Sequence, residues 1–523
     1  MSVQCLRDYL LESLRAIPGT RDFRLYVFVS SPKKHTELYQ FARPRPKVYA
    51  QDILILVSEF LPNIPEDSMS GTPPADSETS RHVFVTAVEA TVFHVPATSS
   101  AIFYVSKVDT TGQGAYPSPT SFIVRSLLVF YVDPATRPIP VEHVWIHLFA
   151  RAQPQYVFPN SADFTDKKPL TDVKLCIWWK RLLGEVAASV NKTSPAVSKT
   201  PSPPVVTQLY YVLPGYSESE ARQLLKDTSE TPWTYGHPYT QSTIPLPCPR
   251  VNPSSTWCNL GHFIPHFDDD PKSRFLDDLA CHADVEGVKS PPRKRARTNT
   301  SGNKPEKPVS SADHSKEMPP GELSKVTPTE FWERISFRQE CSSGAVTGFF
   351  VFGASCPSKS VGSSSPLAPM PGQVSPLMNK RIFETLRTRV EFSTRDLAVH
   401  ATQTMETLIK GLCDDISAPS TGVLSKAPLL LSADARSTTP PSAPHVPSLT
   451  PPSTPPPRVR SLPDVSPNPF PEPVASLDTY HNHIFGHASV NNVPTERAER
   501  GGMSKDGVPK VTVLTARKKK KHA

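Results

Sequence analysis

The 523-residue chain lacks the features that hold structural metals or cross membranes. Its eight cysteines are scattered and form no C-x-x-C pair, which argues against a structural zinc site and for a reducing compartment. No apolar run is long enough to span a bilayer, and the N-terminal stretch MSVQCLRDYLLESL contains acidic residues, unlike a signal or transit peptide. We therefore expect no bound metal and no membrane contact.

Several common enzyme motifs are also absent. The chain contains no G-x-x-x-x-G-K-[ST], H-E-x-x-H or G-x-S-x-G pattern. The stretch DTTGQGA (109–115) is similar to the glycine loop that holds phosphate in common N-acetyltransferases, but Asp109 stands where Arg or Gln is expected. Taken alone, this stretch is better interpreted as a turn after a strand.

Broad positive charge is absent from the part of the chain that we expect to fold. The net charge is +8, and the tracts RKRAR (293–297) and RKKKK (517–521) supply four and five positive charges. The remaining chain is therefore near neutral, which disfavours a DNA-binding regulator with a basic folded domain. Each tract is typical of a nuclear-import signal or of a weak, non-specific contact to nucleic acid.

Periodicity predicts an α/β (α+β) fold, with a mixed central sheet flanked by helices. We expect strands at 23–31, 82–95, 101–109 and the start of 143–161, and helices at 3–16, 120–132, 171–190, 378–390 and 394–412. Residues 52–61 fit either a strand or a helix. Residues 208–225 predict a strand and then a helix with a capping box at Ser217 and Glu220, and Ser393 is the expected cap of the last helix.

Composition divides the chain into four parts. There are 60 prolines and only 37% hydrophobic residues, so much of the chain is not expected to fold. We expect one folded domain formed by residues 1–283 and 328–413. A disordered basic insertion at 284–327 would interrupt it, and a Ser/Pro-rich tail at 414–523, also disordered, would follow it.

The stretch HFDDDPKSRFLDDL (266–279) contains more aspartates than a helix start needs. Asp270 before Pro271 fits an N-cap followed by proline at the first helical position. Asp268 and Asp269 would lie favourably at the positive end of the helix dipole. A cap explains one aspartate well and the other two only loosely, and no EF-hand spacing follows. On this string alone the structural interpretation is favoured over a functional one.

A longer stretch resembles a known family. HVWIHLFARAQPQYVFPNSADFTDKKPLTDVKLCIWWKRLL (143–183) is similar to the core of the fungal histone H3 lysine acetyltransferases of the regulator-of-Ty-transposition type, distant relatives of the CREB-binding-protein acetyltransferases. Further motifs match in the same order: SKVDTTG, YVLPGYSESEARQLL, WTYGHPY, DDPKSRFLDDL and FRQECSSGAVTGFFVFG. The resemblance covers about residues 1–280 and 330–412.

The chemistry of lysine acetylation is consistent with these residue types. A substrate lysine with a pKa of ~10.4 is neutral in roughly one molecule in 10³ at pH 7. Carboxylates can position its ammonium, and aromatic side chains can desolvate it, but a carboxylate or water must finally accept the proton. Acetyl-CoA also carries phosphates, which arginine or lysine would bind.

The resemblance implies a role for each of several residues. The acetyl-CoA groove would be lined by Phe149, Ala150, Arg151, Gln153 and Tyr156, with Tyr156 near the thioester and also catalytic. Asp109 and Thr110 match the cofactor loop of the distant relatives, with Asp109 also taken as catalytic, and Thr120 opens the helix after that loop. Trp178 or Trp179 would wall the acyl and lysine channel, and Trp179 is favoured.

The resemblance also assigns roles around the aspartate run. Asp269 and Asp270 would form the acidic pair at the substrate mouth, so Asp270 would cap a helix and face a substrate at once. Lys272 matches a buried lysine that becomes autoacetylated in the family. Asp268 keeps its interpretation as a solvated partner of the helix dipole.

Together these observations predict a nuclear acetyltransferase that uses acetyl-CoA and no metal to modify lysines of histone H3. The resemblance implies H3–H4 substrates presented by chaperones of the anti-silencing-function and nucleosome-assembly types, core and tail H3 lysines as targets, and roles in replication-coupled nucleosome assembly, DNA damage response and genome stability. The alternative is a catalytically inactive chromatin adaptor that recruits partners through its tails. An adaptor need not bind acetyl-CoA, so binding discriminates between the two.

Overall fold

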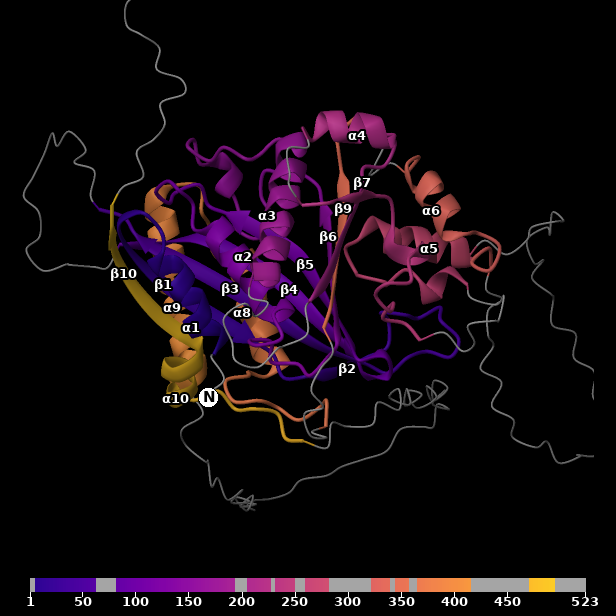
Figure 1. Ribbon diagram of the computed structural model, residues 1–523. Coiled ribbons are helices and arrows are strands. Elements are labelled where there is room, and N and C mark those ends of the chain that lie inside the picture. The colour runs from indigo at the N-terminus through magenta and orange to yellow at the C-terminus, as the bar shows by residue number, and fades with distance from the viewer. Residues whose placement is uncertain are drawn as a thin grey trace, which may run out of the picture.

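Apolar stretches from the first half of the chain, together with residues 348–355 and 485–492, form one mixed sheet, which helices cover on both faces (Figure 1). The structure is a computed structural model that describes residues 5–62, 81–192, 205–226, 231–249, 259–281, 321–338, 344–356, 365–414 and 470–493. This architecture confirms the predicted fold class. The predicted loop at 63–80 lies outside the described residues.

The sheet has ten strands, in the order β10-β1-β3-β4-β5-β6-β9-β7-β8 with β2 paired to β3. Neighbouring strands are antiparallel except for two parallel pairs, β5 with β6 and β7 with β8. The bounds are β1 Gly19–Val29, β2 Lys33–His35, β3 Val48–Phe60, β4 His82–Val95, β5 Ser100–Thr110, β6 His143–Ala150, β7 Val206–Val212, β8 Thr234–Tyr235, β9 Gly348–Ser355 and β10 Phe485–Asn492.

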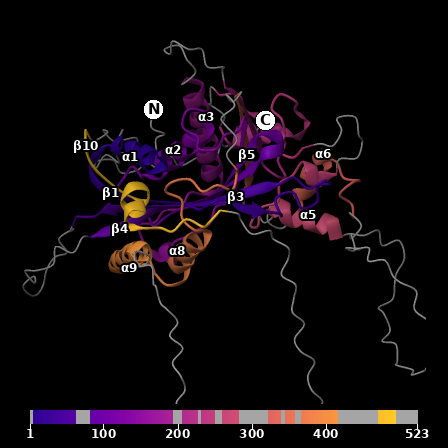
Figure 2. The same ribbon diagram turned by 90° about the horizontal axis from the view of Figure 1, so that it is seen from below.

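Helices form a layer on each side of the sheet. Helices α1 (Leu6–Arg15), α2 (Thr120–Val132) and α3 (Asp172–Lys192) lie on one face, and α8 (Pro376–Thr388) and α9 (Arg395–Asp414) lie on the other (Figure 2). The other α-helices of the described residues are α4 (Glu218–Leu224), α5 (Pro271–Cys281), α6 (Pro328–Ile335) and the short α10 (Leu477–Thr479). None of the described helices is long and apolar enough to cross a membrane.

Burial on both faces decides the ambiguous segment at 52–61. Residues 53–59 of β3 are all buried, and alternate side chains enter two different hydrophobic clusters. A strand covered on both faces is expected to be continuously apolar, which periodicity alone does not distinguish from a buried helix. The run is therefore a strand.

The C-terminal tail is not wholly disordered, so that prediction is wrong for residues 470–493. β10 pairs antiparallel with β1, from Tyr26 opposite Phe485 to Gly19 opposite Asn492. Its alternate residues Ala488 and Val490 are buried. Proline content elsewhere in the tail concealed this short alternating stretch. The rest of the predicted tail lies outside the described residues.

Two smaller expectations also need correction. Leu323 and Val326, inside the predicted insertion, are buried in one cluster with residues of α5 and α6. The helix at 394–412 is capped by Thr394, whose hydroxyl accepts a hydrogen bond from the backbone N–H of Leu397 at 3.3 Å, rather than by Ser393. The capping box at Ser217 and Glu220 is confirmed.

Candidate active site

The parallel strands β5 and β6 part before they end, and a cavity opens between them. Their pairing runs from Ser100 opposite His143 to Val105 opposite Leu148. The other edge of β6 stays paired with β9 as far as Ala150. The cavity has a volume of about 780 Å³ and is lined by residues 105–110 of β5, 148–154 from β6 and its loop, and parts of α2 and α3. We call this cavity the splayed-strand groove.

A β-bulge marks the same point on β5. The register with β4 slips between Glu89 and Ala90, so that Ser106 is the extra residue. The Ser106 hydroxyl donates a hydrogen bond to the backbone carbonyl of Glu89 at 3.0 Å. A bulge bends its strand and increases its twist, which accounts for the divergence of β5 from β6 beyond this residue.

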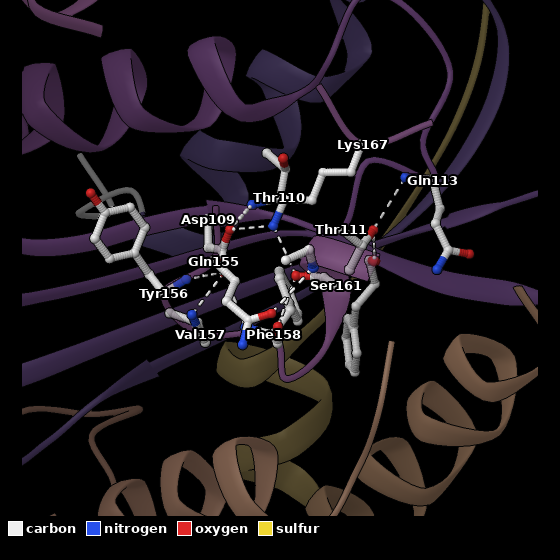
Figure 3. A network of polar contacts seen from close by, with 12 residues as sticks. Asp109, Thr110, Thr111, Gln113, Gln155, Tyr156, Val157, Phe158, Ser161 and Lys167 are labelled. Carbon is white, nitrogen blue, oxygen red and sulfur yellow. Dashed lines mark hydrogen bonds and ion pairs between the residues drawn. The ribbon is translucent and has the colours of Figure 1, made fainter. Parts of the chain in front are cut away.

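Asp109, near the end of β5, organises one wall of the splayed-strand groove (Figure 3). Its Oδ2 accepts hydrogen bonds from three consecutive backbone N–H groups, those of Tyr156, Val157 and Phe158, at 2.8, 2.7 and 3.1 Å. Its Oδ1 accepts from the Thr110 N–H and from Lys167 Nζ at 2.8 and 3.1 Å. Both oxygens are engaged and only 4% of the side chain is exposed, so we infer that Asp109 positions this loop and is not a catalytic residue.

The loop held by Asp109 places Tyr156 on the groove. Burial raises the pKa of Tyr156 to about 12, and the Asp109 carboxylate adds to the effect. The hydroxyl is therefore protonated at neutral pH and available as a hydrogen-bond donor. The sequence predicts Tyr156 in the groove, but its protonation state follows only from its burial in the folded chain.

The structure brings together every residue predicted to contact the cofactor. The groove lining includes Phe149, Ala150, Arg151, Gln153, Tyr156, Thr110 and Thr120. It also includes Arg125, Lys167, Lys168 and Arg181, which sequence reasoning missed. The adjacent lysines 167 and 168, just before α3, could have indicated this part of the groove, because a pair of cations near a predicted cofactor loop can bind phosphates.

Both tryptophans of α3 line the groove. Their rings are nearly perpendicular, with centroids 4.6 Å apart. The Trp178 indole N–H donates to the Ser121 hydroxyl at 3.0 Å, which fixes it against α2, whereas Trp179 lies deeper in the core with 5% exposure. The preference for Trp179 as the channel wall stays a prediction.

Asp269 and Asp270 lie in opposite environments, so the prediction of an acidic pair at the mouth is wrong for Asp270. Asp269 has 43% of its side chain exposed and accepts hydrogen bonds from the Tyr104 hydroxyl at 2.9 Å and from Lys107 Nζ at 3.0 Å. Asp270 has no exposed surface. Its Oδ1 accepts from the Lys272 backbone N–H at 2.9 Å, which confirms the cap.

Lys272 is buried, as the resemblance implied, with 1% exposure. Its Nζ lies 3.0 Å from Asp270 Oδ2 and 5.0 Å from the centre of the Phe349 ring. Several polar atoms near this pair are buried and have no hydrogen-bond partner among the described residues; they include His147 Nδ1, Tyr239 Oη and Trp332 Nε1. Burial holds the pKa of His147 well below its usual value, and Lys272 adds to the effect.

The diverging parallel strands thus leave a space lined by cations and aromatic rings. Residues 130–408, more than half of the chain, match the family described as "Histone acetyltransferase KAT11-type domain", and the chain belongs to this family. The resemblance found in the sequence is thereby confirmed. No group of three or more side chains suited to metal binding occurs in the described part of the chain.

Two curated relatives are similar over about half of this chain. "Histone acetyltransferase rtt109" of Aspergillus flavus is 28% identical over 293 residues, which cover 53% of this chain and 45% of the relative. "Histone acetyltransferase rtt109" of Schizosaccharomyces pombe is 26% identical over 272 residues, which cover 52% and 56%. The chain thus spans about half the length of these relatives.

A solved structure supports the fold. "Crystal structure of Rtt109 from Aspergillus fumigatus" matches with a TM-score of 0.55 at 23% identity, covering 77% of this chain and 96% of that chain.

Proposed function

We propose that this chain transfers the acetyl group of acetyl-CoA to lysines of histones. The observation that carries the proposal is the splayed-strand groove, where Tyr156, two tryptophans and several cations line the space between β5 and β6. Membership of the histone acetyltransferase family supports the same reaction. Where β5 and β6 stop pairing, their backbone N–H and C=O groups need other hydrogen-bond partners. The amide groups of an extended pantetheine arm would form those hydrogen bonds.

The cationic lining suits the rest of the cofactor. Arg151, Lys168, Arg125 and Arg181 line the groove together with few acids. Guanidinium and ammonium groups bind phosphate oxygens through charge-assisted hydrogen bonds. We therefore assign the phosphates of CoA to this set, and the thioester to the inner part near Tyr156 and Trp179.

The reaction needs a neutral amine and an acceptor for its proton. The amine nitrogen attacks the thioester carbonyl carbon, the C–S bond breaks, and the CoA thiolate leaves as the amide forms. Asp269, which is partly exposed beside Lys107, accepts the proton lost by the amine, directly or through water. The Tyr156 hydroxyl, which is protonated at neutral pH, donates a hydrogen bond to the departing sulfur.

We further propose that the substrate is histone H3 within H3–H4, with lysines of its core and tail as targets. Chaperones of the anti-silencing-function and nucleosome-assembly types would present it in the nucleus, during replication-coupled nucleosome assembly and the DNA damage response. The two basic tracts supply import signals and a salt-sensitive contact to an acidic chaperone or to DNA.

Lys272 is the proposed site of autoacetylation. Its ammonium is buried among aromatic rings, an expensive location for a charge. Acetylation would replace that charge with an amide, whose oxygen could accept from the unpaired Tyr239 hydroxyl or Trp332 indole N–H. Peptide mass spectrometry of active protein tests this assignment, and an unmodified Lys272 in active protein overturns it.

Acetyl-CoA binding separates an enzyme from the adaptor alternative. Calorimetric titration of the protein with acetyl-CoA should show one site, weakened at least tenfold by Arg151→Ala and little changed by Arg389→Ala, an exposed arginine after α8 that does not line the groove. Mass spectrometry of H3–H4 incubated with and without a chaperone then identifies the acetylated lysines. Absence of binding together with absence of transfer would favour the adaptor.

A further inference from the structure

A second large cavity lies on the sheet face that carries α8. It has a volume of about 690 Å³. Its walls come from β3, β4 and β5, from residues 266–269 before α5, and from the start of α8. We call it the α8-side groove. Helices α2 and α3 lie on one face of the sheet and α8 lies on the other (Figure 2). Because α2 and α3 line the splayed-strand groove and α8 lines the α8-side groove, the two cavities approach β5 from opposite sides.

The two cavities share two lining residues, Ser106 and Lys107. These are the bulge residue of β5 and its neighbour, where β5 begins to diverge from β6. A direct transfer requires the thioester carbon and the acceptor nitrogen to come within about 3–3.5 Å of each other. A bound acetyl-CoA fills one side of this point, so the other side is where an acceptor can approach.

Acidic side chains predominate in the α8-side groove. Its five carboxylates are Asp52, Glu89, Asp268, Asp269 and Glu472. Its three ammonium groups are Lys33, Lys107 and Lys380, and His35 and His266 also face it. Apolar surface is present as well, in Tyr104, Phe267 and the exposed Leu377. This combination suits a segment with positive charges and an aliphatic stem.

The C-terminal segment completes the α8-side groove. Glu472 is exposed at its edge and belongs to residues 470–493, which fold back onto the sheet through β10. Glu472, which lies 58 residues beyond the end of α9 at Asp414, thus contributes charge to the same cavity as β4 and β5.

Lys107 lies where the two cavities meet. Its Nζ is 2.7 Å from Glu89 Oε2 and 3.0 Å from Asp269 Oδ2. Burial by itself would lower the pKa of Lys107, but Glu89 and Asp269 more than offset it, so the pKa is raised. The side chain is 21% exposed. It therefore remains a cation held between two carboxylates at the junction.

We propose that the α8-side groove receives the segment carrying the acceptor lysine, that this segment is rich in basic residues, and that Lys107 is a positioning residue for the acceptor amine. The inference rests on the proposed acetyl transfer and adds to it the path and charge of the substrate. Lys107 keeps Glu89 and Asp269 in place and neutralises part of their charge.

The charge of Lys107 has a predictable effect on the acceptor. A nearby cation disfavours the ammonium form of an incoming lysine, whereas the two carboxylates favour it. The other charged groups facing the junction are Asp268, Lys380 and His266 in the α8-side groove, and Asp109, Lys167 and Arg151 in the splayed-strand groove. None of these changes in a Lys107 variant, so the acceptor pKa should rise when the Lys107 charge alone is removed.

The first test uses Glu472→Gln, which removes an exposed charge far from the thioester. Initial rates are measured with two H3 peptides that share one acceptor lysine, one with flanking arginines and one with those arginines replaced by glutamine. We expect the variant to raise KM for the arginine peptide about three- to tenfold, to leave KM for acetyl-CoA unchanged, and to affect the glutamine peptide little. Equal KM values for both peptides on the wild type would overturn the docking assignment.

The second test uses Lys107→Met, with Lys107→Arg and the exposed β2 variant Lys34→Met as controls. The rising limb of kcat/KM against pH should move up by about one pH unit or more in Lys107→Met and stay in place in both controls. An unmoved limb in Lys107→Met, or an equal shift in Lys107→Arg, would overturn the role of Lys107. A wild type that transfers no acetyl group would instead contradict the proposed function itself.

Discussion

Asp270 and Lys272 form an ion pair 3.0 Å long in which neither side chain has more than 1% of its surface exposed. Removing one member of such a pair leaves an uncompensated buried charge, whereas removing both does not. Asp269, one residue earlier, is 43% exposed and contacts Lys107 instead. We therefore propose that Asp270 stabilises the fold and that Asp269 takes part in the chemistry.

In protein whose Lys272 is not acetylated, Asp270→Ala should lower the free energy of unfolding by about 3–5 kcal/mol, because the Lys272 ammonium would lose its buried partner. Urea unfolding followed by fluorescence measures this loss. Asp268→Ala, at an exposed position of the same run, is the control and should change stability by less than about 0.5 kcal/mol. The double variant Asp270→Ala/Lys272→Met should recover part of the loss, and a double variant as unstable as the single one would contradict a charge-pair explanation.

Asp269→Asn should lower kcat by about 10²-fold or more while the unfolding free energy changes by less than about 1 kcal/mol, because the amide keeps the shape but does not accept the amine proton. Steady-state rates beside a melting curve separate the two effects. Asp163→Asn, at an exposed position that lines neither groove, is the matched control and should keep wild-type kcat. If the two variants have equal rates, Asp269 does not act on the acceptor.

Asp109→Ala should abolish cofactor binding by loosening the loop, since five hydrogen bonds end on its two oxygens. Each buried N–H group that loses its acceptor costs about 1–3 kcal/mol, so we expect the loop at 156–158 to change its conformation. Hydrogen exchange should show faster exchange at the amides of Tyr156, Val157 and Phe158 before any effect on β3. Slow exchange at those amides in the variant would contradict the positioning role.

Two C-terminal truncations, one that keeps β10 and one that removes it, should differ in stability. A chain ending at 493 should keep acetyl-CoA binding, whereas a chain ending near 415 should be less stable and prone to association, because it exposes the edge of β1 and loses the buried residues Tyr480 and Ile484. Calorimetric melting and light scattering compare them. Identical melting of the two truncations would mean that β10 adds nothing to the fold.

Stability should fall as the pH drops from about 6.5 towards 4. Burial lowers the pKa of His82 to about 4, with Arg24 adding to the effect, and burial alone lowers that of His94 to about 4. The unfolded chain therefore binds protons in this range that the folded chain does not, which favours unfolding. His94→Gln should reduce the slope of unfolding free energy against pH, and an unchanged slope would contradict a neutral buried imidazole.

Most of the sheet could be predicted from the sequence because its strands are long and strongly apolar. The helix at 120–132 and the strand at 82–95 have the predicted bounds. β10 could not be predicted, since its short alternation has meaning only beside β1, more than 450 residues away. The different exposure of Asp269 and Asp270 could not be predicted either. It depends on tertiary contacts, those of Asp269 with Tyr104 and Lys107 and that of Asp270 with Lys272.

The most direct test of the account is acetyl transfer from isotope-labelled acetyl-CoA to H3–H4 by the purified chain. We predict labelled acetyl-lysine on H3, formed at a rate that saturates with acetyl-CoA and that falls about 10²-fold or more in Asp269→Asn but not in Asp163→Asn. Label that stays in acetyl-CoA, from a protein that is folded and binds the cofactor, would contradict it.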